Sequence, residues 1–136
     1  MDRNAYVLDA YAVMAYLQDE VGADIVAEVL EKASEKKIRL FMHLLNLGEV
    51  YYNVYKEDGE AKANTVYATI KKYPVEFVSL TEESLLKAAR IKGKYPISYD
   101  DAFAVVTSID NEAALISGDP ELSQLQDDGL IELIWR

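Results

Sequence analysis

The sequence contains no cysteine and a single histidine. Without thiols the chain forms no disulfide, iron–sulfur cluster or thiolate zinc site, and it has no cysteine nucleophile. One histidine likewise argues against a catalytic triad or a histidine-based metal centre. Any metal chemistry in this chain is therefore expected to rest on carboxylates.

Long apolar runs and basic charge are also scarce. No stretch is apolar for long enough to cross a bilayer, and no secretory leader opens the chain, so we expect a cytoplasmic protein with no membrane partner. The formal net charge is −10, which argues against a simple basic patch for nucleic acid. Solubility is the plain explanation of this charge, and a concentration of acids for cation binding is the alternative.

The apolar residues that are present divide the chain into alternating strands and helices. The chain has 136 residues, 51% of them apolar, with no linker or repeat, so we expect residues 1–136 to form a single domain. The predicted strands cover residues 6–9, 38–42, 75–78, 113–116 and 130–134. The predicted helices cover residues 10–17, 22–34, 46–55, 61–72, 81–94, 102–110 and 121–125. This order predicts an α/β fold, a three-layer α/β/α sandwich with a mostly parallel central sheet.

Four acids far apart in the sequence fall on one rim of such a fold. In a parallel α/β unit, helices begin at the edge where strands end. Asp9 ends the first strand, and Glu49 lies in the first turn of the helix after the second strand. Asp101 opens the helix that leads into strand 113–116, and Asp119 lies just beyond that strand.

Three of these acids also have a plainer interpretation as helix caps. Glu49 and Asp101 stand three residues after Asn46 and Ser98, the capping-box position, where a carboxylate contributes about 0.3–1 kcal/mol. Asp119 precedes a proline and is as readily an ordinary N-cap.

Asp9 is different, because a carboxylate that ends a buried strand costs desolvation unless it is paired or bound to a cation. No basic residue stands close to it in the sequence. Four acids on one rim would also repel one another and raise each other's pKa values. A hard divalent cation such as Mg²⁺ or Mn²⁺ resolves both problems and indicates phosphoryl transfer or phosphodiester hydrolysis.

Four segments together resemble the PIN-domain family, specifically its VapC-type toxins. They are YVLD at 6–9, NLGEV at 46–50, ISYDDA at 97–102 and LISGDPEL at 115–122. This resemblance covers nearly the whole chain. It implies an Mg²⁺- or Mn²⁺-dependent ribonuclease, usually a homodimer, that a cognate antitoxin holds inactive by laying its C-terminal segment in a groove beside the active site.

The resemblance also implies roles for individual residues. It carries the family's four acids onto Asp9, Glu49, Asp101 and Asp119, and its supporting hydroxyl onto Ser117. In that interpretation Asp9 and Asp101 are metal ligands, Asp119 binds directly or through water, and Glu49 binds the metal or orients the attacking water.

Two positions complicate this assignment. Asp100 competes with Asp101, which we favour because it directly precedes the alanine of the family pattern. After the first acid, many members carry Ser or Thr where this chain has Ala10 and Tyr11, which removes a hydroxyl contact to the metal-bound water or the acid.

Residues that contact substrate or partner are harder to identify. Lys87, Arg90 and Lys94 recur at helical spacing, which is typical of a solvated face and alternatively of a phosphate-binding stripe. Tyr51, Tyr52 and Tyr55 cover more than one face of a helix, and we interpret them as a dimer or antitoxin surface. We expect His43 and Trp135 to be structural.

Two other functions compete with the ribonuclease. The first is a catalytically weak or silent PIN-like protein-binding module, in line with the altered residues after Asp9. The second is a phosphatase or phospho-acceptor domain on a similar sheet. A dehalogenase-type phosphatase needs an acid where this chain has Tyr11, and a receiver domain needs a lysine that the segment 117–119 lacks.

Overall fold

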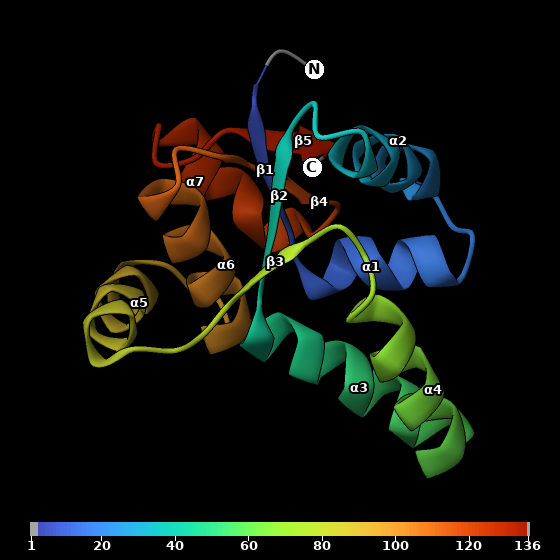
Figure 1. Ribbon diagram of the computed structural model, residues 1–136. Coiled ribbons are helices and arrows are strands. Elements are labelled where there is room, and N and C mark those ends of the chain that lie inside the picture. Colours follow the sequence, from blue (N-terminus) through green and yellow to red (C-terminus); the bar gives the residue numbers. More distant parts are fainter. Residues whose placement is uncertain (1–2, 136) are drawn as a thin grey trace.

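A five-stranded parallel sheet forms the centre of the computed structural model, which describes residues 3–135 (Figure 1). The strand order is β3-β2-β1-β4-β5, and every neighbouring pair is parallel. The strands are β1 (Ala5–Leu8), β2 (Arg39–His43), β3 (Glu76–Val78), β4 (Ala114–Ser117) and β5 (Leu133–Trp135). The predicted parallel α/β sheet is thus confirmed, with the first strand at its centre.

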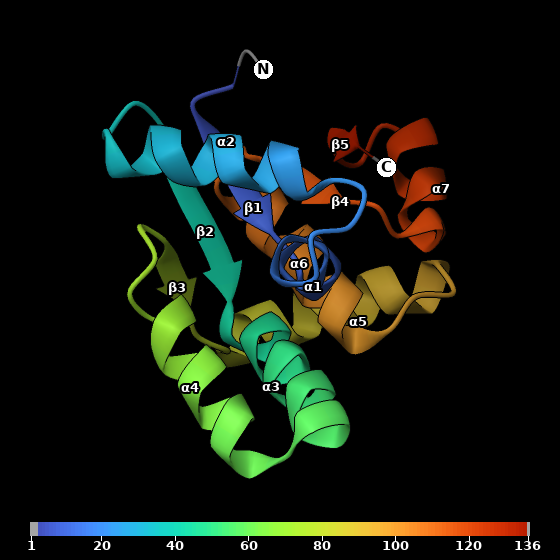
Figure 2. The ribbon, with the colours of Figure 1, turned by 90° about the vertical axis from the view of Figure 1, so that its right-hand side faces the viewer.

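Helices cover both faces of this sheet. They are α1 (Ala10–Leu17), α2 (Ala23–Ser34), α3 (Leu44–Asp58), α4 (Glu60–Ile70), α5 (Glu82–Lys94), α6 (Tyr99–Asp110), the 3₁₀ turn η1 (Pro120–Leu122) and α7 (Ser123–Asp127). In Figure 1, α1 and α2 lie to the right of the sheet, and α5 and α6 lie to its left. Figure 2, turned by 90°, shows α2 across the front of β1 and β2. Within residues 3–135, every helix falls short of the length and hydrophobicity that crossing a membrane would need.

Side-chain alternation along β1 produces the three layers. Tyr6 and Leu8 point into the core shared with α1 and α2, whereas Val7 points into the core shared with α6. All three side chains are fully buried, and each contributes about 1.5–3 kcal/mol through apolar burial. A strand buried on both faces is rigid, so the residue that follows it is held in a fixed place.

The start of α3 differs from the prediction. The helix begins at Leu44, and its N-cap is His43, whose Nδ1 accepts a hydrogen bond from the Leu45 amide at 3.0 Å. Asn46 is therefore inside the helix, and Glu49 lies in its second turn, so the predicted capping box is wrong. The reason is that β2 runs directly into α3, and a buried neutral imidazole offers the acceptor that the first turn needs.

The last strand is also shorter than predicted. It covers Leu133–Trp135 rather than residues 130–134. The Leu130 amide donates to the carbonyl of Leu125 at 2.9 Å and so still belongs to the turn that ends α7. The other strands and helices that the sequence predicted exist, with ends that differ by a few residues.

Candidate active site

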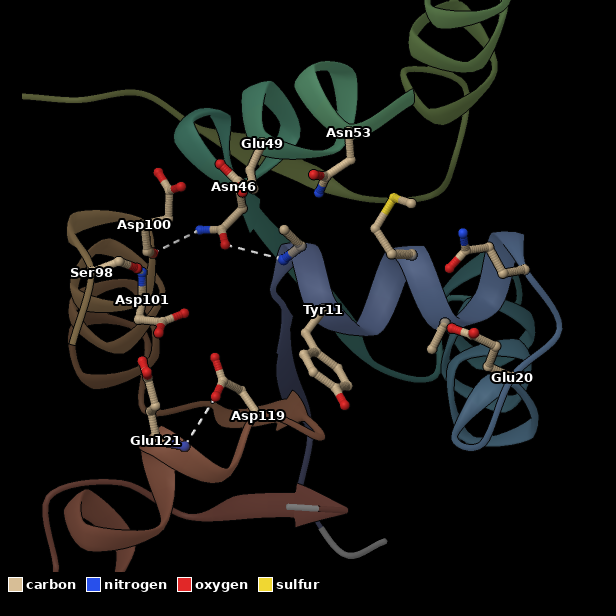
Figure 3. A pocket seen from close by; sticks show the side chains of 14 residues that line it. Tyr11, Glu20, Asn46, Glu49, Asn53, Ser98, Asp100, Asp101, Asp119 and Glu121 are labelled. Carbon is tan, nitrogen blue, oxygen red and sulfur yellow. Dashed lines mark hydrogen bonds between the residues drawn. The ribbon is translucent and has the colours of Figure 1, made fainter. Parts of the chain in front are cut away.

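A pocket of about 480 Å³ opens where β1 and β4 end, between α1, α3, α6 and η1 (Figure 3). Six acidic side chains line it, and none of the described residues that line it is basic. The acids are Glu20, Glu49, Asp100, Asp101, Asp119 and Glu121. Three of the four sequence-predicted acids thus face one cavity, and the fourth, Asp9, lies buried at the end of β1.

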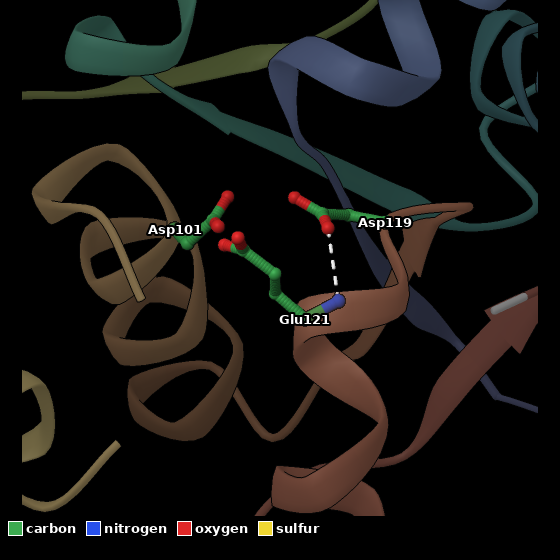
Figure 4. Close-up of side chains that lie close together, drawn as sticks. All are labelled: Asp101, Asp119 and Glu121. Carbon is green, nitrogen blue, oxygen red and sulfur yellow. Dashed lines mark hydrogen bonds between the residues drawn. The ribbon is translucent and has the colours of Figure 1, made fainter. Parts of the chain in front are cut away.

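Three carboxylates meet at one side of this pocket (Figure 4). One oxygen each from Asp101, Asp119 and Glu121 lies within 4.8 Å of the other two. Burial raises the pKa of Asp101 to about 8, and the negative charges of Asp119 and Asp9 add to the rise. We call Asp101, Asp119 and Glu121 the carboxylate cluster.

Hydrogen bonds from backbone amides fix the position of Asp119 in this cluster. The Asp119 carboxylate caps η1 by accepting from the Glu121 amide at 3.0 Å, and Ser117 Oγ accepts from the Asp119 amide at 3.1 Å. Asp119 is therefore both an N-cap and a member of the cluster. Ser117, the predicted supporting hydroxyl, sets the turn that aims Asp119 at Asp101.

Asp9 lies behind the cluster with only 1% of its surface exposed. Its Oδ1 accepts from the Ala12 amide at 2.8 Å and so caps α1, whereas its Oδ2 has no hydrogen-bond partner within residues 3–135. Burial raises the pKa of Asp9 to about 7, against the lowering effect of the Ser117 hydroxyl and the Ala12 amide. A buried oxygen without a partner, next to other carboxylates, is a feature that a bound cation explains.

Glu49 and Asp100 form a second acidic pair. Their side chains share a hydrogen bond, which is the main reason that the pKa of Glu49 is raised, and burial and the charge of Asp100 act in the same direction. In Figure 3 this pair lies on the α3 side of the pocket, away from Glu121. The neighbouring Asp100 and Asp101 thus point to different acids, and Asp101 is the one in the carboxylate cluster.

Two residues of this site are not among those that the sequence predicts. The sequence predicts Glu121 only as the start of a short helix, although an acid two positions after Asp119 is a visible signal. It predicts Asn46 as a helix cap. In the structure it is buried, its Oδ1 accepts from the Ala10 amide at 3.1 Å, and its Nδ2 donates to the Asp100 carbonyl at 3.2 Å. One side chain thus ties α1, α3 and α6 together around the pocket.

Replacing Asn46 with Ala is expected to lower the free energy of unfolding by about 1–3 kcal/mol, because the substitution leaves the Ala10 amide and the Asp100 carbonyl without their partner. Urea denaturation measures the loss. Asn53→Ala is the matched control, since Asn53 lies on the same helix and lines the same pocket but its side chain makes no hydrogen bond with other described residues. Equal losses in both variants would contradict the bridging role of Asn46.

The basic stripe predicted from Lys87, Arg90 and Lys94 lies elsewhere. None of the three lines the acidic pocket. Lys87 Nζ pairs with Asp110 at 3.0 Å and with Glu83 at 3.3 Å, so its charge is already balanced at the protein surface. The solvated-face interpretation describes Lys87 better than the phosphate-binding one.

The residues of the site fit a hard divalent cation. Every candidate ligand is a carboxylate oxygen, the donor type that Mg²⁺ and Mn²⁺ prefer. The carboxylate cluster brings three such oxygens together, and the unpartnered Oδ2 of Asp9 supplies a fourth acceptor nearby. Burial and mutual repulsion raise the pKa values of Asp9 and Asp101, and a cation at this place would compensate their charges.

Comparisons with known proteins agree with this geometry. The family model described as "PIN domain" matches residues 6–128. No curated protein matches the chain. Among solved structures, the chain is similar to DNA-bound VapBC from Salmonella typhimurium, with a TM-score of 0.72 and 12% identity over 98% of this chain and 100% of that chain.

Two further VapBC structures show the same fold. VapBC2 from Rickettsia felis bound to a promoter DNA fragment gives a TM-score of 0.69 at 15% identity, over 95% of this chain and 96% of that chain. VapBC-1 from nontypeable Haemophilus influenzae gives 0.66 at 13% identity, over 95% and 96%. At such identities the likeness shows a common fold.

Proposed function

Because the chain belongs to the PIN-domain family, we propose that it is an Mg²⁺- or Mn²⁺-dependent endoribonuclease and the VapC-type toxin of a toxin–antitoxin pair, with residues 1–136 as a single PIN-like domain. PIN domains are a nuclease family, so hydrolysis of nucleic acid is the reaction class. The observation that carries the proposal is the carboxylate cluster beside the unpartnered Oδ2 of Asp9.

The residues of the pocket have distinct tasks in this reaction. Asp101 and Asp119, with Asp9 behind them and Glu121 beside them, would hold the cation. When bound, a divalent cation lowers the pKa of a water molecule and neutralises charge on the phosphate. Ser117 orients Asp119 through its backbone amide.

Glu49 is our candidate for moving the proton. It faces the pocket from α3, and its interaction with Asp100 raises its pKa, which makes the Glu49 carboxylate a stronger base. We propose that the Glu49 carboxylate orients the attacking water and takes its proton as the water oxygen bonds to phosphorus and the bond to the leaving oxygen breaks.

The proposed partners are an antitoxin protein and a second copy of the chain. Support for the antitoxin comes from the neighbours, three of which are VapBC structures by their titles and a fourth of which is titled a toxin–antitoxin complex. The surface that the sequence indicated for such a partner is available on α3, where Tyr52 and Tyr55 are about half exposed and do not line the acidic pocket. The half-exposed rings are compatible with either partner.

A protein-binding module without catalysis is the second candidate function. The observation that favours it is a pocket with six acids and no basic residue among the described residues that line it, which repels a polyanion until a cation is bound. Calorimetry separates the two: the silent module predicts no heat with Mg²⁺ or Mn²⁺, whereas the ribonuclease predicts binding of the metal.

We expect the purified chain to cleave single-stranded RNA internally when Mg²⁺ or Mn²⁺ is present and to stop when EDTA removes the metal, because without a cation the carboxylates repel the phosphate and the pKa of the attacking water is not lowered. Gel analysis of a labelled RNA and of a DNA with the same sequence measures the reaction and its substrate class. Metal-dependent cleavage of the DNA alone would refute the ribonuclease activity but would still show that the chain is a nuclease. No cleavage of either substrate would favour the binding module.

A further inference from the structure

An aromatic ring forms part of the wall beside the carboxylate cluster. Tyr11, the second residue of α1, lines the pocket and is 47% exposed. Figure 3 shows its ring next to Asp119. The packing agrees, because a Cβ placed on Gly118, the residue before Asp119, would lie 2.7 Å from Tyr11 Cε1. The ring therefore lies against the same turn that presents the Asp119 carboxylate.

Trp135 holds this ring in place. The two ring centroids are 5.5 Å apart with an interplanar angle of 68°, an edge-to-face arrangement. Trp135 itself packs onto two glycines, since an added Cβ would lie 2.4 Å from its ring at Gly22 and 2.5 Å at Gly118. Its φ of +84° is strained for a bulky residue, so surrounding contacts must fix it. Trp135 thus supports the Tyr11 ring by a direct aromatic contact.

A half-exposed tyrosine on a protein surface needs no explanation by itself. Tyr11 differs because of where it stands. Among the described residues that line the pocket it is the only aromatic, and no lysine or arginine there can hold a phosphate. A nucleotide that enters the pocket therefore has two sources of attraction, a cation at the carboxylate cluster and the face of the Tyr11 ring.

We propose that Tyr11 stacks on the base of the nucleotide whose phosphate lies at the carboxylate cluster. The inference rests on the proposed function, since it assumes that a phosphate is held there. Base stacking on an aromatic ring tolerates every base, because each base has a π-face. Trp135 acts as a positioning residue that keeps the ring ready for the base.

A pair of ligands that differ only by the base tests the proposal. Calorimetric titration with 5′-AMP and with ribose 5-phosphate, both in Mg²⁺ buffer, compares the full chain with Tyr11→Ala, Tyr11→Phe and Leu86→Ala. Leu86 is the matched control because it is 52% exposed on α5 and does not line the pocket. Circular dichroism verifies that each variant is folded, and the fluorescence of the chain's single tryptophan, Trp135, reports locally on the Tyr11 ring.

We expect Tyr11→Ala to weaken 5′-AMP binding about 5- to 150-fold and to leave ribose 5-phosphate binding unchanged, the range measured for loss of one base–aromatic stack. Tyr11→Phe and Leu86→Ala should bind both ligands as the wild type does, and 5′-AMP should change Trp135 fluorescence more than ribose 5-phosphate. Equal weakening of both ligands, an unchanged affinity for 5′-AMP, or no 5′-AMP binding by the wild type would overturn the proposal.

Cleavage of RNA by the wild type in the same buffer keeps the two hypotheses separate. If the wild type cleaves RNA with metal but the affinity for 5′-AMP does not depend on Tyr11, the stacking site is refuted and the ribonuclease function stands. Affinity that depends on Tyr11 without any cleavage refutes the ribonuclease and leaves a nucleotide-binding site.

Discussion

Replacing Asp101 with Asn is expected to abolish metal-dependent RNA cleavage and, at the same time, to stabilise the metal-free protein at high pH. Asp101 stands in the carboxylate cluster, and its pKa is raised to about 8 by burial and by the charges of Asp119 and Asp9. An amide binds a divalent cation poorly, so a loss of several kcal/mol in transition-state stabilisation lowers the cleavage rate by at least about 10³-fold.

The stability of Asp101→Asn should move in the opposite direction. Above its raised pKa the wild-type carboxylate is ionised among other acids, and the neutral amide removes that repulsion. Asp101 is only partly buried, so after allowance for solvent screening the gain is about 1–2 kcal/mol. The cap of α6 is kept, because Ser98 Oγ accepts from the backbone amide of residue 101. Urea denaturation of the metal-free variant at about pH 9 measures the gain.

Asp110→Asn is the control for both readouts. Asp110 lies at the other end of α6 and pairs with Lys87 at the surface. Its replacement should change stability by about 1 kcal/mol or less and leave cleavage intact. If the Asp101→Asn variant cleaves RNA at the wild-type rate, the carboxylate cluster is not the active site. If the variant is less stable than the wild type at every pH, repulsion from the neighbouring acids does not destabilise ionised Asp101.

The parts of the fold that follow from local chemistry were predictable. The run that ends on Asp9 is apolar at every position, which is typical of a strand buried on both faces, and β1 has its side chains in two cores. The place of Asp9 at the end of that strand alone predicts that its carboxylate is desolvated. The structure gives it the expected environment, a carboxylate with 1% exposure and one oxygen without a partner.

The parts that depend on tertiary contacts were not predictable. The sequence predicts Asn46 at a helix N-cap, where its side-chain oxygen would accept a hydrogen bond from a backbone amide of the first turn. In the structure His43 caps α3, which leaves Asn46 free to bond Ala10 and Asp100 across the pocket. Nothing local decides between two residues that can both cap a helix.

Glu121 is a second residue whose role depends on tertiary contacts. Its position after Pro120 predicts the start of a short helix, and η1 is indeed there. Its role in the carboxylate cluster depends on the packing of α6 next to η1, which brings Asp101 of α6 close to Glu121 of η1. Sequence spacing identifies which acids share a rim, and only the packing identifies which of them meet.

Without metal, the protein is expected to lose stability as the pH rises from about 5 to about 8, and Mg²⁺ or Mn²⁺ should restore it. The folded-state pKa values of Asp9 and Asp101 are about 7 and about 8, above the value near 3.9 of an unfolded chain. Between these limits the folded protein binds protons that the unfolded chain has lost. The free energy of unfolding therefore falls with increasing pH, by up to about 1.4 kcal/mol per pH unit for each group.

Asp9 accounts for the larger share of this loss because it is fully buried, whereas solvent screens the partly exposed Asp101. A folded-state pKa of about 7 for Asp9, against a value near 3.9 in the unfolded chain, corresponds to roughly 4 kcal/mol, a large part of the 5–15 kcal/mol that stabilises an ordinary domain. Asp9→Asn should therefore flatten the pH dependence of the metal-free protein, whereas Asp127→Asn, on the short helix α7 and outside the pocket, should not.

A cation should reverse the same loss because it binds the ionised carboxylates and competes with their protons. At a metal concentration about 100 times the dissociation constant, binding adds about 2.7 kcal/mol to the free energy of unfolding. That gain should be largest at about pH 8 and nearly absent at about pH 5, where the protons still occupy the site. Urea denaturation across this range, with NaCl at equal ionic strength as the control, measures it. Equal stabilisation by Mg²⁺ at both ends of the range, or metal-free stability that rises with pH, would contradict a cation site built on Asp9 and Asp101.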